Sequence, residues 1–123
     1  MSSIRRTYRV EVSGQFDRPA GDVRQALTDA QRDHERTAAA FTADGTLTYS
    51  ASLTRFMFRY LIEVEESSAV EADGMAVLMA ELRAQDYLAA RDIPSKGTHT
   101  TATCLEDLKI RRNRKAVRSH GSQ

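Results

Sequence analysis

The chain has 123 residues and a mass of 13.7 kDa, which is enough for one hydrophobic core and too little for an enzyme with a separate cofactor domain. Its composition, 41% hydrophobic and 28% charged, is that of a folded globular protein rather than a disordered or fibrous one. The formal net charge of +1 hides an uneven distribution, because residues 109–123 hold six basic residues and no acidic one. Residues 1–108 therefore carry a net charge of −5, from 12 basic and 17 acidic residues.

Patterns for secretion, membrane insertion and metal binding are missing from the sequence. No apolar stretch follows the arginines of Met1–Val10, and the longest apolar candidate, Met75–Leu82, already contains Glu81. We therefore expect a cytoplasmic protein without a membrane span. One cysteine and three scattered histidines give no spacing typical of metal ligands. Nucleotide-binding and hydrolase motifs are also missing, so we expect neither a metal nor a cofactor.

Three segments alternate apolar and polar residues in the way that indicates strands. The first is Thr7–Phe16. The second, Thr46–Leu53, follows an Asp-Gly pair at 44–45, the strongest turn signal in the chain. The third covers residues 56–65 and is expected to form a hairpin with the second.

Two segments have the spacing of apolar residues that indicates helices. Asp17 is a candidate N-cap for the first, in which apolar positions recur from Ala20 to His34, so we expect four to five turns. The second is predicted to begin at the capping box Ser68-Ala69-Val70-Glu71 and to end before Pro94. The side chains expected to face the core from this second helix are Ala72, Met75, Met79 and Leu82, with Leu78 on their flank.

Residues 96–105 are rich in threonine and are predicted to form a fourth strand. The order strand, helix, strand, strand, helix, strand is that of the ferredoxin-like α+β sandwich. It predicts a four-stranded antiparallel sheet with two helices on one face, the other face being open to water or to a partner. We expect residues 1–108 to form this domain and residues 109–123 to form a flexible basic tail.

Four short segments resemble a known family. They are Arg6-Thr7-Tyr8-Arg9-Val10 with Gly14 and Phe16, the segment FTADGTLTY at 41–49, Phe56-Met57-Phe58-Arg59, and Thr101-Ala102-Thr103. Together they are similar to a family of small actinobacterial proteins of unknown function, over about residues 6–108. The resemblance implies the small α+β fold, and it brings no established reaction and no site residues.

The two faces of the predicted sheet carry different side chains. One face is aromatic and carries Tyr8, Tyr49, Phe56, Phe58 and Tyr60. Its simplest interpretation is a core packed under the helices, and the alternative is that its tyrosines edge a cavity and orient an oxygen-bearing ligand. The other face is polar and carries Arg9, Glu11, Arg59, Glu63 and His99. Its simplest interpretation is a solvated surface or a dimer interface.

The functional alternative is a pocket for a small organic metabolite, in a cleft at the sheet or in the interface of a homodimer. The substrate would be bound by Arg9, Tyr49 and Arg59, because an arginine side chain forms hydrogen bonds to anionic and carbonyl groups. His99 and Tyr60 would be the catalytic residues, with His99 as general base. The protein would then be a cofactor-independent enzyme or a binding protein.

Two further reactive side chains are interpreted as structural. His34 falls near the end of the first predicted helix, where the helix dipole favours a charged imidazole. Cys104 has no histidine or basic residue beside it in the sequence, and it is interpreted as a small buried apolar residue.

The basic tail leaves a different class of function open. Its residues 109–118 carry six positive charges and no aromatic residue, which is typical of a fraying terminus. The alternative is a non-enzymatic interaction module whose tail docks on nucleic acid or on an acidic protein. Because residues 1–108 are acidic, we expect nucleic acid to contact the tail alone.

Overall fold

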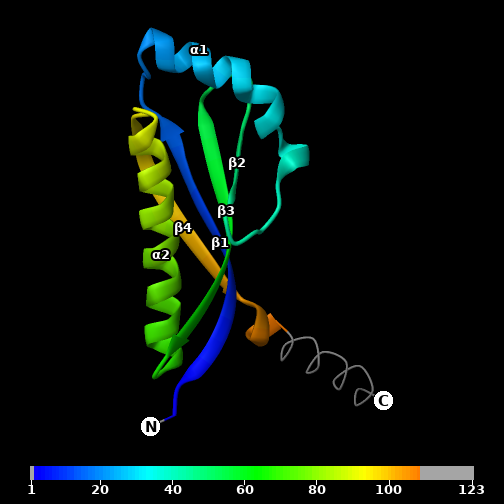
Figure 1. Ribbon diagram of the computed structural model, residues 1–123, viewed down its shortest axis with the longest axis vertical. Helices are drawn as coiled ribbons and strands as arrows, with labels where there is room; N and C mark the ends of the chain where they lie inside the picture. The colour runs from blue at the N-terminus through cyan, green and yellow to red at the C-terminus, as the bar shows by residue number, and fades with distance from the viewer. Residues whose placement is uncertain (1, 109–123) are drawn as a thin grey trace, which may run out of the picture.

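The computed structural model describes residues 2–108 and has a mixed α+β fold (Figure 1). The predicted basic tail, 109–123, lies outside the described residues. The elements in chain order are β1 (Ile4–Phe16), α1 (Gly21–Ala30), the 3₁₀ turns η1 (Gln31–His34) and η2 (Arg36–Ala38), β2 (Thr46–Tyr49), β3 (Arg55–Glu66), α2 (Ala69–Ala90) and β4 (Ser95–Cys104). The predicted α+β class and antiparallel sheet are confirmed, and the strand order is β2-β3-β1-β4.

β1 and β3 form the centre of the sheet. They pair antiparallel from Ile4 opposite Glu66 to Gln15 opposite Arg55, and alternate side chains along most of both strands are buried. The predicted aromatic face is confirmed as core, since all of its residues are buried: Tyr8, Tyr49, Phe56, Phe58 and Tyr60. β2 is shorter than predicted because the chain turns after Tyr49.

α2 covers one face of the sheet with a row of alanines. Its buried side chains are Ala72, Ala76, Ala80, Ala84 and Leu88. The prediction that Met75, Leu78 and Leu82 face or flank the core is wrong, because they are 37%, 50% and 51% exposed. The aromatic and branched side chains of the sheet already fill the space under the helix, so a row of methyl groups fits there and larger side chains turn outward.

α1 is shorter than predicted and lies across the end of the sheet rather than alongside α2 (Figure 1). It begins at Gly21 without a side-chain cap. The predicted cap, Asp17, lies three residues before the N-cap position, Ala20, and its carboxylate lies 3.8 Å from Lys96 Nζ. Leu27 is the one buried residue of α1, and so little apolar surface cannot hold a long helix along the sheet. The expectation of two helices on one face is therefore corrected: α2 covers the face, and α1 lies across its end.

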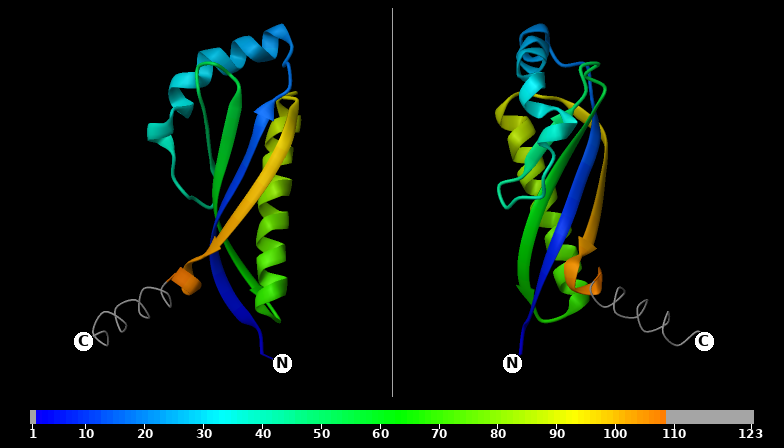
Figure 2. Two further views of the ribbon diagram at one scale, coloured as in Figure 1. Left: turned by 180° about the vertical axis from the view of Figure 1, so that it is seen from behind. Right: turned by 90° about the vertical axis from the view of Figure 1, so that its right-hand side faces the viewer.

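Residues 31–45, here called the descending segment, lead from α1 to β2. Within this segment the Thr42 carbonyl accepts the Leu61 N–H at 2.8 Å, and Thr42 bridges Tyr60 of β3. The predicted Asp-Gly turn is confirmed, with Gly45 at a φ of +87°. Figure 2 shows α2 on one side of the sheet and no long helix on the other within the described residues.

Candidate functional site

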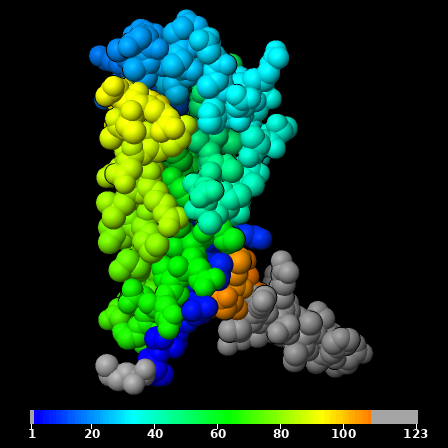
Figure 3. Space-filling model, in the orientation of Figure 1, coloured from blue at the N-terminus to red at the C-terminus, as the bar shows by residue number. Residues whose placement is uncertain are grey.

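A groove lies on the helix-covered face of the sheet. One of its sides is α2, and the other is formed by α1 and the descending segment (Figure 3). It consists of three adjoining cavities of about 490, 290 and 490 Å³. Tyr87 lines all three, and His34 and Leu47 line the first two. The groove exists because α1 crosses the end of the sheet and leaves no second long helix beside α2.

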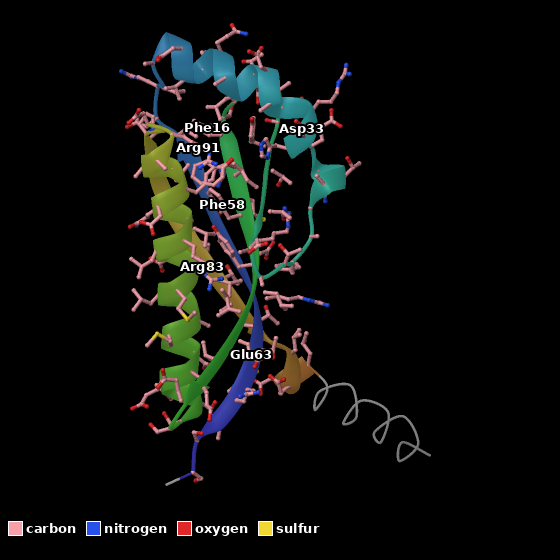
Figure 4. All side chains as sticks on the ribbon, in the orientation of Figure 1. Phe16, Asp33, Phe58, Glu63, Arg83 and Arg91 are labelled. Carbon is pink, nitrogen blue, oxygen red and sulfur yellow. The ribbon has the colours of Figure 1, made fainter. Side chains whose placement is uncertain are left out.

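The wall from α2 is built from three residues spaced four apart, Arg83, Tyr87 and Arg91. This spacing places them on one side of the helix. The Arg91 guanidinium lies 3.6 Å from the centre of the Tyr87 ring, and Arg83 donates to the Ala43 carbonyl of the descending segment at 2.9 Å. Tyr87 itself contacts the Phe58 ring edge-on at 5.4 Å, and Figure 4 labels Arg83, Arg91 and Phe58. The wall is thus aromatic in its middle and cationic at both ends.

The floor of the groove includes two of the predicted site residues. Tyr49 lines the cavity next to α1, and Tyr60 lines the cavity at the other end. Burial raises the pKa of each hydroxyl to about 12. Both are therefore neutral at physiological pH, and neither can act as a base there. The Tyr60 hydroxyl can exchange hydrogen bonds with a ligand, whereas the Tyr49 hydroxyl already donates to the Leu27 carbonyl at 2.6 Å.

His34 lies on the side of the groove opposite Tyr87. Its Nδ1 is 2.9 Å from the Leu47 carbonyl, and because a carbonyl only accepts, Nδ1 must carry the proton. The ring stacks on Tyr49 with centroids 5.2 Å apart. In the neutral imidazole the Nε2 atom is therefore left as a hydrogen-bond acceptor, and it makes no hydrogen bond to another described residue.

The groove also carries carboxylates. Its cavities are lined by two arginines, named above, and by Asp22, Asp33, Asp44, Asp86 and Asp92. The lining is therefore acidic on balance. Such a lining disfavours anionic ligands and suits uncharged or cationic ones.

The other predicted site residues lie on the open face of the sheet. Arg59 donates to the Thr48 hydroxyl at 2.9 Å, and its Nε lies 3.9 Å from Glu11. Arg9 lies 5.7 Å from the centre of the Phe41 ring. His99 is exposed on the edge strand β4.

The sheet separates these three residues from the two tyrosines, because side chains alternate between its faces. No one pocket among residues 2–108 can bring together all five predicted residues. Sequence reasoning missed Arg83, Tyr87 and Arg91, and the signal that could have found them is their four-residue spacing on the second helix.

A second polar cluster lies where β1 and β4 meet the start of α2. The Tyr8 hydroxyl donates to Asp73, and burial together with this bond raises the pKa of Tyr8. Arg6 donates to Asp107 at 2.8 Å. Cys104 is buried as predicted and lies against the Glu106 carboxylate at 3.3 Å. These bonds tie the last described residues to the core.

Two absences hold within residues 2–108. No group of three or more histidine, cysteine, aspartate or glutamate side chains is placed to hold a metal ion. No helix in this range is long and apolar enough to cross a membrane.

Comparison with protein families matches residues 1–116 to a model described as "Family of unknown function (DUF6204)". The chain belongs to this family. No curated protein and no solved structure matches it. The resemblance to a family of unknown function is thereby confirmed, and the actinobacterial origin stays a prediction.

The family match contains the whole groove and both faces of the sheet. It also extends past residue 108, where the resemblance noticed in the sequence ends. Residues 109–116, most of the basic run, are therefore part of the DUF6204 region.

Proposed function

We propose that this protein binds a small organic molecule in the groove beside α2. The observation that carries the proposal is the cavity of about 490 Å³ between α1, β2 and the end of α2. Small-molecule sites typically measure roughly 300–1,000 Å³ and combine apolar walls with a few polar groups. Here the apolar part includes Val23, Leu27 and Leu47, and the polar part includes His34 and Arg91.

The ligand class follows from the side chains. Tyr49, Tyr87 and His34 offer aromatic surfaces that favour a planar ring. The acidic lining favours a ligand that is uncharged or cationic, since both arginines are already engaged by Tyr87 and Ala43. We therefore propose a planar aromatic ligand without a negative charge.

Catalysis, if the bound molecule is a substrate, would use His34 as general base. Its Nδ1–H is held by the Leu47 carbonyl, which fixes the tautomer with Nε2 free to take a proton. Tyr60, predicted as catalytic, lines the far end of the groove and would act as a hydrogen-bond donor. This assigns the role first given to His99 to a different histidine, and the reaction would need no cofactor.

The test is a thermal-shift screen with matched aromatic amines, neutral amides and carboxylates, followed by calorimetric titration of the hits. We expect hits among amines and amides but not carboxylates. Tyr87→Leu and His34→Gln should each weaken a hit about tenfold or more, which corresponds to about 1.4 kcal/mol. Arg59→Met and His99→Ala on the open face serve as controls. If the controls abolish binding while the groove variants do not, the site is on the open face and the proposal is wrong.

We also propose that the open face forms a homodimer. This face carries both signs of charge, with Arg9 and Glu11 on β1 and Arg59 and Glu63 on β3, so it can pair with a second copy of itself. Leu61 lies among them and is half-buried. Sedimentation should show that Leu61→Glu converts a dimer to a monomer, and a wild-type monomer at all concentrations would refute the idea.

Two finer predictions remain proposals. The βαββαβ element order and the antiparallel pairing support a ferredoxin-like classification. The position of α1 across the end of the sheet is a departure from that arrangement. The cytoplasmic location rests on the sequence alone.

The alternative function, a basic tail that docks on nucleic acid or an acidic protein, rests on the six basic residues of 109–118. Replacing Arg111, Arg112 and Arg114 by glutamine in the full chain should abolish salt-sensitive binding to heparin or DNA. The thermal shift by a groove ligand should be unaffected. Heparin binding that survives these changes would exclude the tail as the binding segment.

A further inference from the structure

The outward side of α2 carries large apolar residues that nothing in residues 2–108 covers. Five large apolar side chains in this range are exposed, and four of them, Val70, Met75, Leu78 and Leu82, lie on α2. We call Met75, Leu78 and Leu82 the outer strip. Their spacing of three and four residues is the spacing by which one helix packs against another.

Two of the three residues of the outer strip, Leu78 and Leu82, lie opposite the alanine row, and Met75 lies on its flank. At 100° per residue, Leu78 and Leu82 point away from the side of Ala76 and Ala80, which the sheet covers. α2 is therefore apolar on two opposite sides. A helix of that kind is normally buried on both sides, and only the sheet side is covered within the described chain.

Gly74 is a second, independent observation at the same surface. It is exposed and lies one turn before Leu78, on the same side of the helix. A Cβ added there would meet no atom within 4 Å, so the packing of this chain does not require a glycine. Glycine weakens a helix interior, whereas a missing side chain lets the backbone of a partner approach closely.

The charges beside the outer strip indicate the chemistry of the partner. Glu71 lies in line with it, Glu81 and Asp86 lie at its edges, and none of the three forms a salt bridge with another described residue, while Glu71 accepts the Ser67 hydroxyl. The basic side chains of α2 point elsewhere, with Arg83 bonded to Ala43 and Arg91 stacked on Tyr87. A second copy docked through the same strip would set acidic edges against acidic edges, and an anionic membrane would be repelled.

We propose that the outer strip docks an amphipathic helix of another protein, with basic residues flanking its apolar side. The apolar contact would bury Leu78 and Leu82, and the basic flanks would pair with the three carboxylates. Met75, Leu78 and Leu82 do not line the groove, whose α2 wall is Arg83, Tyr87 and Arg91, and Asp86 borders both surfaces. The proposed docking therefore does not require a ligand in the groove.

The test uses the full chain and a synthetic helical peptide with leucine at heptad positions a and d and lysine elsewhere. Calorimetric titration should detect binding that a scrambled peptide of the same composition does not reproduce. Leu78→Gln and Leu82→Gln should each weaken it tenfold or more, whereas Ile4→Gln, which changes an exposed apolar residue elsewhere, should not. Glu71→Gln should make the binding less sensitive to salt.

Four results would overturn the proposal. The first is equal binding of the scrambled peptide, and the second is unchanged binding by both leucine variants with intact helical circular dichroism. The third is tighter binding at the strip by a peptide of residues 109–118, which would assign the surface to the chain's own basic segment. Self-association lost on Leu78→Gln would likewise replace the proposed partner by a second copy.

Discussion

Gly45 and Gly74 differ in what the fold requires of them. Gly45 has a φ of +87°, and a Cβ there would overlap the Tyr60 ring. Gly74 lies in α2, where an added Cβ meets nothing. Only the first is demanded both by backbone conformation and by a close neighbour.

Gly45→Ala should therefore destabilise the protein by about 1–3 kcal/mol, because alanine at positive φ is strained and Tyr60 must move. Gly74→Ala is the matched control, and it should stabilise by about 0.5–1 kcal/mol through helix propensity. Urea unfolding of both variants measures the two changes. Equal effects would mean that the turn at Gly45 is not as described.

At this scale the sequence predicted some features and not others. The Asp-Gly turn is local, so its signal survives in the sequence. The contact between Gly45 and Tyr60 is not local, and neither is the stacking of His34 on Tyr49. The sequence therefore offers no reason to place His34 beside the sheet, and His99 was predicted as the catalytic histidine because it falls on the polar face of the predicted sheet.

Among the elements, α1 is held by the fewest contacts. Leu27 is its buried side chain, and the Leu27 carbonyl accepts the Tyr49 hydroxyl at 2.6 Å. At the helix end the Gln31 N–H donates to Thr28 rather than to Leu27. The tyrosine therefore satisfies a carbonyl that the helix leaves without an internal partner.

Tyr49→Phe should loosen α1, because the Leu27 carbonyl loses its donor at a cost of about 1 kcal/mol. Hydrogen exchange should accelerate across residues 21–34 and stay unchanged in β1 and β3. Tyr60→Phe is the control, since the Tyr60 hydroxyl makes no hydrogen bond to another described residue. Uniform acceleration in both variants would contradict an anchoring role for Tyr49.

The elements themselves were well predicted where a period was strict, as in β1 and β3. The orientation of α2 was not, because both of its sides are apolar and periodicity alone cannot tell which one faces the sheet. Alanine ranks low in hydrophobicity, so Met75 and Leu82 outweighed Ala76 and Ala80 in the pattern. In the structure, aromatic side chains fill the sheet face under α2, so the small alanine side chains pack against it and the larger ones face outward.

At the scale of the whole molecule, the buried tyrosines make the free energy of unfolding depend on pH in the alkaline range. Burial raises the pKa of Tyr49 and Tyr60 to about 12, whereas in the unfolded chain a tyrosine titrates at about 10. Below pH 10 both states are protonated, and the full stability is present. Above it the unfolded chain loses protons first, so this stability falls as the pH rises from 10 to 12.

We therefore expect the free energy of unfolding in urea to be flat from pH 8 to about 9.5 and to drop by pH 11. Tyrosinate absorbance of the native protein at pH 11 should be lower than that of the unfolded protein. Tyr60→Phe should make the drop shallower. A stability that stays flat up to pH 11 would show that these hydroxyls are accessible in the folded state.

The groove could not be predicted from the sequence, because it depends on where α1 lies relative to α2. The alternation along β1 and β3 predicted the two faces of the sheet, and with them the separation of Arg59 from Tyr60. The spacing of Arg83, Tyr87 and Arg91 was visible in the sequence. That these residues line a groove could not be inferred from the spacing, because the opposite wall comes from residues more than 35 positions earlier in the chain.

The alanine row has a consequence for how the position of α2 is fixed. A methyl group recurs every four residues from Ala72 to Ala84, so sliding the helix along its axis by about 6 Å, the rise of four residues, with a rotation of about 40° would put each methyl where its neighbour had been. These contacts therefore give little resistance to such a slide. The position of α2 is instead fixed by contacts outside the alanine row: the Tyr8 hydroxyl donates to Asp73, Tyr87 packs edge-on against Phe58, and Arg83 donates to the Ala43 carbonyl.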